Sequence, residues 1–233
     1  QERASSRGAF LLGAAALGVI ILGGGGAVIA LNRDSESILL LGTVLGLVAV
    51  TLYMYDIVHL YRARKRRVIE LNSIMAMAAM VSLVLAALLI AILLAMGQLA
   101  HHASAVIFLV AFGWLSGLGL AMLYKIVPFL TWLECYGPIL GKEVTPRVQD
   151  LVEERHARKW FVFYFLGVWG AVAALLVDAT SVFRIAAALM LVATAGIIIQ
   201  LVRARRLDDV PISARFPTGS YRPRLFMTSI RPD

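Results

Sequence analysis

Long apolar runs dominate this chain and leave few options for its fold. Six of them lie near residues 9–31, 38–61, 74–96, 103–133, 160–177 and 183–202. A run of about 18 or more apolar residues is long enough to cross a bilayer as a helix. The runs therefore predict an all-α, polytopic transmembrane helix bundle of about six spans within residues 1–202.

The composition agrees with a membrane protein and argues against a soluble domain. The 233 residues are 61% hydrophobic and 15% charged, whereas soluble domains are about half apolar and about a quarter charged. The net charge of +8 would suggest nucleic acid as a partner of a soluble domain. Because the basic residues lie at the ends of the runs, we expect a lipid bilayer and no nucleic acid. The single cysteine, Cys135, excludes an internal disulfide.

Lysine and arginine are distributed unevenly between alternate loops. Residues 62–67, 134–159 and everything after 203 carry nearly all of them, whereas 32–37, 97–102 and 178–181 carry a single arginine. Basic loops stay in the cytoplasm. We therefore expect both visible ends of the chain in the cytoplasm, and a bacterial inner membrane as the location.

The first run has a second interpretation. Arg7 precedes it and small residues follow Leu22, as in a cleaved signal peptide. The run is longer than the usual apolar region of a signal peptide, so we favour a retained span. The chain begins with Gln1 rather than methionine, and further helices or a processed peptide before it are left open.

The polar stretch between the fourth and fifth runs contains a helix start signal. Thr145-Pro146 combines a capping hydroxyl with proline at the first helical position. We expect an amphipathic interfacial helix near residues 146–157, in which Glu154 and Arg158 can pair. The fourth run is long enough to tilt or kink, with Pro128 near its end.

The basic tail, residues 203–233, has no helical or strand period, and two interpretations remain open. It is either disordered against anionic lipid or an extended arm that docks on a partner subunit. Aromatic and arginine side chains commonly anchor interfaces. The candidate docking residues are Phe216, Tyr221, Phe226, Arg215, Arg222 and Arg224.

Three ionisable residues within the runs are candidates for function because charge inside a bilayer is costly. Asp56 and His59 lie on one face of the second run, and Lys125 lies in the fourth. Asp56 and Lys125 are expected at similar depth, where they could form an ion pair or reach the interface separately. A proton or ion relay is the functional alternative.

A metal site is a further alternative. His101 and His102 are adjacent in a loop, and Met96 precedes them by about one turn; histidine and methionine suit copper. No cofactor is strongly implied. Common enzyme signatures such as the P-loop and His-Glu-x-x-His are absent from the sequence, which favours a non-catalytic role.

Glycines in the fourth run predict close helix packing. Gly113 and Gly117 are four residues apart and Gly119 follows, a spacing that lets helices approach closely within this bundle or across a dimer.

Residues 119–132, GLAMLYKIVPFLTW, resemble a span of bacterial membrane proteins that are distantly similar to subunit I of haem–copper oxidases. The resemblance implies that Lys125 could correspond to the lysine that feeds protons in such oxidases. The histidines that hold haem and copper in that family are missing, because none of the six runs has a histidine near its middle, so the resemblance implies a cofactor-free relative.

The sequence thus favours a non-catalytic membrane subunit or accessory protein of a larger complex, with a respiratory complex as the candidate class. A small proton- or ion-coupled transporter is the first alternative. A copper- or haem-associated membrane protein is the second.

Overall fold

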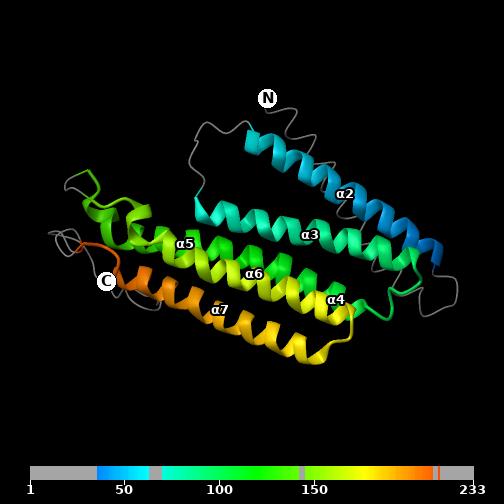
Figure 1. The fold of residues 1–233 in the computed structure, drawn as a ribbon. Helices are drawn as coiled ribbons and strands as arrows, with labels where there is room; N and C mark the ends of the chain where they lie inside the picture. Colours follow the sequence, from blue (N-terminus) through cyan, green and yellow to red (C-terminus); the bar gives the residue numbers. More distant parts are fainter. Residues whose placement is uncertain (1–35, 63–69, 142–144, 212–214, 216–233) are drawn as a thin grey trace, which may run out of the picture. The chain divides into compact units, whose positions relative to one another are not determined.

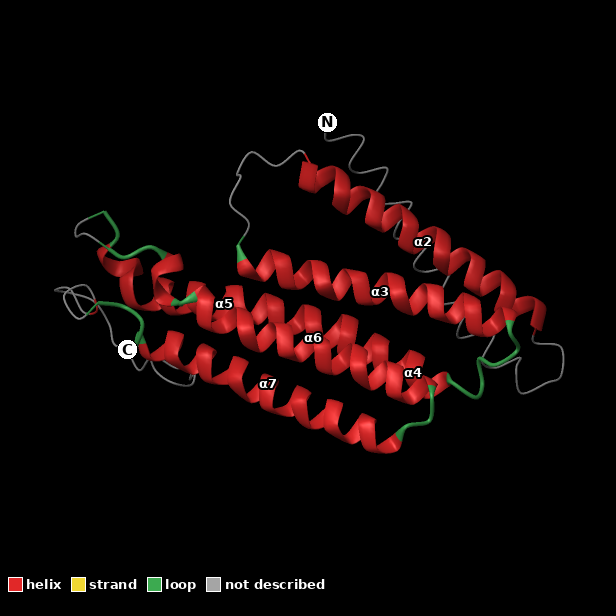
Figure 2. Ribbon diagram, viewed as in Figure 1, coloured by secondary structure: helices red, strands yellow, loops and turns green. Residues whose placement is uncertain are grey.

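The computed structural model describes residues 36–62, 70–141, 145–211 and 215. These residues are predominantly helical, and five of the helices are long and apolar enough to cross a membrane (Figures 1 and 2). The all-helical class expected from the sequence is therefore confirmed, and the lengths and composition of these five helices fit a multi-pass membrane protein. The first run, residues 9–31, lies outside the described residues, so the sixth span stays a prediction.

The helices extend beyond the predicted bounds at several ends. The elements, in chain order, are α2 (Glu36–Arg62), α3 (Leu71–Ala95), α4 (Ala103–Phe108), η1 (Leu109–Ser116), α5 (Gly117–Tyr136), η2 (Gly137–Ile139), η3 (Val148–Leu151), α6 (Glu154–Leu176) and α7 (Thr180–Arg206). The chain divides into two compact units. The described part of the first is residues 36–62 and 80–114, and that of the second is 70–79 and the described residues from 115 onward.

In the first unit, α3 ends in a glycine turn and packs against η1. Gly97 adopts a left-handed conformation with φ of 67°, and the N–H of Gln98 bonds back to the carbonyl of Leu93. This motif satisfies carbonyls that the helix end would leave free. Farther along, a Cβ on Gly113 would lie 2.9 Å from the Cβ of Ser82, so the two helices are in close contact there.

The fourth run contains a π-helical segment. Residues 103–136 are assigned to helix throughout, and η1 within this stretch has the wider π geometry. Pro128, which the sequence placed near the end of a run long enough to tilt or kink, lies inside α5, and the helix continues to Tyr136. The change of helix type lies around Gly113, where the close approach to Ser82 is made.

In the second unit, α6 and α7 form a hairpin and α5 packs beside it (Figure 1). The buried face of α6 includes Phe161, Tyr164, Phe165 and Val168. Phe161 meets the ring of Tyr124 from α5 edge-on, with ring centroids 5.6 Å apart. Apolar side chains and close backbone contacts therefore hold the three helices together.

The prediction of an interfacial helix near residues 146–157 is wrong. The stretch forms only the short 3-10 helix η3, and Val152 and Glu153 are extended before α6 begins at Glu154. Leu151 is fully buried, and the Glu154 carboxylate accepts a hydrogen bond from the N–H of Leu71. These tertiary contacts outweigh the helical signal of Thr145-Pro146.

A small apolar core closes the end of the second unit at which α5 and α7 finish and α6 begins, called the polar end below. Its buried members are Cys135, Tyr136, Ile139, Leu151, Leu207 and Val210, with Trp132 packed against them. Leu207 has φ of 59°, in the left-handed region that is costly for leucine, but its side chain is fully buried. Burial of this side chain offsets the backbone cost.

Candidate functional site

The polar end carries a set of paired charges, and the most buried of them is Arg205. Its side chain is only 8% exposed and lies 2.5 Å from a carboxylate oxygen of Glu134. The Arg205 guanidinium also donates to the Thr131 hydroxyl at 3.2 Å. The contacts join the last turn of α7 to the end of α5. The sequence indicated only that the arginines end the sixth span, and it did not predict this pair.

The start of the tail is held at the same end. The Arg215 guanidinium donates to the carbonyls of Asp208 and Val210, both at 3.1 Å. The Tyr136 hydroxyl donates to the carbonyl of Arg215 at 3.0 Å. Arg203 pairs with Asp209 at 2.6 Å. Arg215, a candidate docking residue for a partner, is thus bonded within its own chain.

Lys125 pairs with Glu70 at the beginning of α3. Their charged atoms are 3.3 Å apart, and the side chains are 59% and 32% exposed. Glu70 also accepts from Gln149 at 3.4 Å, whereas Glu154 bonds to the backbone of Leu71 rather than to Arg158. The mostly exposed Lys125 is suited to a surface ion pair more than to a buried relay.

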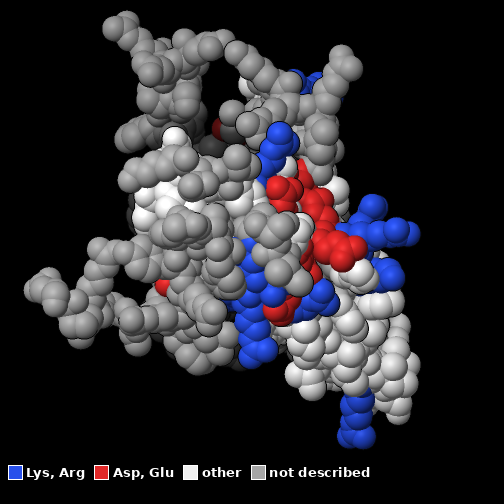
Figure 3. Space-filling view, turned by 90° about the vertical axis from the view of Figure 1, so that its left-hand side faces the viewer, with Lys and Arg blue, Asp and Glu red and all other residues white. Residues whose placement is uncertain are grey.

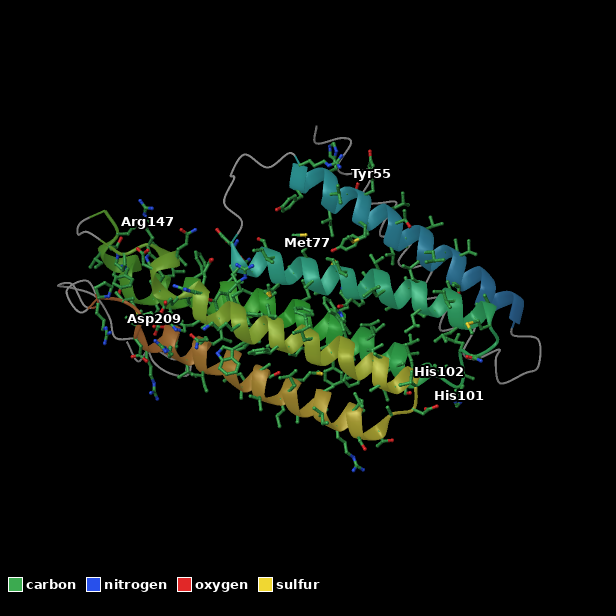
Figure 4. All side chains as sticks on the ribbon, viewed as in Figure 1. Tyr55, Met77, His101, His102, Arg147 and Asp209 are labelled. Carbon is green, nitrogen blue, oxygen red and sulfur yellow. The ribbon has the colours of Figure 1, made fainter. Side chains whose placement is uncertain are left out.

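Asp56 and His59 lie in the first unit and Lys125 in the second, so the coupling of Asp56 with Lys125 stays a prediction. Within α2, His59 is exposed and its ring stacks on Tyr55 with centroids 6.4 Å apart. Tyr55 is 69% exposed (Figure 4). None of the residues within the spanning window of α2, Gly42–His59, is buried.

The histidine pair lies in the turn between α3 and α4. His101 and His102, both labelled in Figure 4, meet edge-on with ring centroids 4.5 Å apart. Met96 is 60% exposed. Among the described residues, no three His, Cys, Asp or Glu side chains gather as a metal site requires. Copper binding by the two histidines and Met96 stays a prediction.

The three glycines of the fourth run differ in their surroundings. Gly113 makes the close contact with Ser82, and Gly117 is buried. A Cβ on Gly119 would meet nothing within 4 Å, so Gly119 makes no close approach in the described chain. The tightest glycine contacts in the second unit are elsewhere: a Cβ on Gly196 would overlap the Trp160 ring.

An open cleft of about 600 Å³ lies beside the ion pairs. Its lining consists of Thr145, Pro146, Gln149, Asp150, Val152, Glu153, Asp209 and Pro211. Arg147 and Asp209 mark this region in Figure 4. In the space-filling view of Figure 3, acidic side chains gather in a patch bordered by basic ones. The carboxylates in the lining already have partners: Asp150 accepts from the Arg147 N–H, Glu153 pairs with His156 and Asp209 with Arg203.

No protein-family model, curated protein or solved structure matches this chain. The resemblance to haem–copper oxidases therefore stays an expectation, and function has to be argued from the chain itself. The ion pairs of Arg205 and Lys125 join the ends of helices, and the bonds of Arg215 hold the start of the tail.

Sequence reasoning missed Glu70, Glu134 and Arg205 because each lies at the end of an apolar run. Charged residues are expected there in any case, because a span ends at the membrane–water interface. One signal was available in the sequence. Arg203, Arg205 and Arg206 lie on different faces of a helix, so their side chains could not all point to solvent on one side.

Proposed function

We propose that this chain is a non-catalytic membrane subunit or accessory protein that presents its tail to a partner in a larger complex. A respiratory complex is the candidate class because of the resemblance of residues 119–132. The orientation that we propose places the polar end and the tail in the cytoplasm of a bacterial inner membrane.

The fixed start of the tail is the observation that supports this proposal most. Tyr136 and the backbone of residues 208–210 together engage both the carbonyl and the guanidinium of Arg215. A disordered tail that lies loosely against lipid does not need a fixed point of attachment to the helices. A docking arm benefits from one, because a held starting point lowers the entropy lost when the arm binds.

Removal of residues 216–233 tests the proposal while leaving the anchored Arg215 in place. We expect the truncated protein to unfold at the same temperature as the full chain, because the bundle contacts remain. In native membranes dissolved with mild detergent, the full chain should migrate in a larger complex with fixed stoichiometry. The truncated chain should lose that complex.

Two variants of the full chain separate the contributions within the tail. Replacing Phe216, Tyr221 and Phe226 by serine removes the aromatic anchors, and replacing Arg222 and Arg224 by glutamine removes charge only. We expect the first variant to lose the complex more completely. A full-length protein that is monomeric in native membranes, or a complex unaffected by truncation, would contradict the subunit proposal.

A further inference from the structure

The outward face of α6 combines two kinds of side chain in sequence along the helix. Arg155, Arg158 and Lys159 are exposed in its first turns. Farther along the same face, Val162, Phe163 and Leu166 are 43%, 43% and 52% exposed. At about 100° per residue these positions fall within a single stripe of the helix.

The opposite face of α6 is the one that packs within the second unit. Ala157, Phe161, Tyr164 and Val168 are each at most 2% exposed. The stripe is therefore not a poorly packed core face. In a spanning helix it is the face turned toward lipid or a neighbouring protein.

The three cations of the stripe have no ion-pair or hydrogen-bond partner among the described residues. The two nearest carboxylates in sequence are engaged elsewhere. Glu153 pairs with His156 at 2.8 Å, and Glu154 accepts from the N–H of Leu71. No carboxylate of α6 therefore forms an ion pair with the three cations.

We propose that this stripe binds an anionic phospholipid, with its headgroup phosphate on Arg155, Arg158 and Lys159 and an acyl chain along Val162, Phe163 and Leu166. Arginine and lysine at the end of a span attract anionic headgroups. A helix rises about 1.5 Å per residue, so Leu166 lies about 12 Å deeper than Arg158. That offset suits a molecule whose charge and chain are joined end to end. A free phosphate would use the cations but gain nothing from the apolar half.

Thermal unfolding of the full chain in a neutral detergent tests the proposal. Added phosphatidylglycerol should raise the midpoint by about 5 °C near saturation, because a ligand that binds only the folded state stabilises it. Phosphatidylcholine with the same acyl chains should raise it much less. Soluble glycerol phosphate, which lacks the chains, should have no comparable effect.

Variants locate the binding to the stripe. Replacing Arg155, Arg158 and Lys159 by glutamine should abolish the difference between the two lipids. Arg158→Gln alone should reduce it, whereas Arg184→Gln should leave it unchanged. Arg184 is the matched control, because it is also an exposed arginine of the α6–α7 hairpin but lies near the opposite end. The single variants decide the matter even if the triple variant does not fold.

Native mass spectrometry adds a count of retained lipids. We expect phosphatidylglycerol to remain bound to the unaltered chain and to Arg184→Gln, and to be lost from the triple variant. Equal stabilisation by both lipids, equal effects of Arg158→Gln and Arg184→Gln, or a full effect of soluble glycerol phosphate would each overturn the proposal.

Discussion

At the scale of single residues, burial decides which ion pair matters for stability. The Arg205 side chain is 8% exposed and its partner Glu134 33%, whereas Lys125 and Glu70 are 59% and 32% exposed. Breaking a fully buried pair costs about 3–5 kcal/mol, and an exposed pair contributes about 0–1 kcal/mol. The two pairs, both in the second unit, therefore allow an internal comparison.

We expect Arg205→Met to lower the free energy of unfolding by about 2 kcal/mol, less than for a fully buried pair because Glu134 retains some contact with solvent. The substitution leaves Glu134 and the Thr131 hydroxyl without their guanidinium partner. Unfolding in detergent, followed by circular dichroism, measures the change in the free energy of unfolding. Lys125→Met is the comparison and should cost about 1 kcal/mol or less.

Combining Arg205→Met with Glu134→Gln should recover part of the loss, because no uncompensated carboxylate then remains. Strictly additive losses would show that the two side chains are not coupled. A cost for Lys125→Met equal to that for Arg205→Met would show that burial is not what separates the pairs.

At the scale of the helices, glycine sets how closely α6 and α7 approach. A Cβ on Gly167 would lie 2.7 Å from Cγ of Met190 and 3.1 Å from the backbone oxygen of Ala186. Three residues later, a Cβ on Gly170 would meet only the Cβ of Ala186, at 3.8 Å. The first position requires glycine and the second does not, although both occur in the same helix.

We expect Gly167→Ala to lower the free energy of unfolding by about 1–2 kcal/mol, the usual cost of overpacking less the better helix propensity of alanine. Gly170→Ala should be neutral or stabilise by up to about 1 kcal/mol. Thermal unfolding of both variants in the same detergent makes the comparison. A destabilisation shared equally by both would argue that backbone flexibility, and not close packing, is what these glycines provide.

At the scale of the whole molecule, orientation in the membrane follows from the charges of the loops and is testable by labelling. We expect a membrane-impermeant maleimide applied from outside to react with cysteine placed at Ser35, His102 or Thr180. Cysteine at Ala63 or Gly219 should react only after the membrane is opened. The native Cys135 does not interfere because it is fully buried. Labelling of a cysteine at Ala63 from outside would contradict the proposed orientation.

The sequence alone determines the class of this protein, because a bilayer leaves few structures open to a long apolar run. Every run from residue 38 onward corresponds to a helix that is long and apolar enough to span, with ends displaced by a few residues. The polar stretch before α6 was misread because local signals such as Thr145-Pro146 compete there with contacts to other helices. Its conformation depends on the burial of Leu151 and on the bond from Leu71 to Glu154.

The partners of the charged side chains were decided only by the tertiary structure. Helical period and run length place Lys125 at a depth and on a face, but they do not say which neighbouring helix brings a carboxylate within reach. Glu70 precedes Lys125 by 55 residues, and Glu134 precedes Arg205 by a similarly long interval of chain. Such pairings depend on how helices distant in sequence come together, and that is a property of packing rather than of any local pattern.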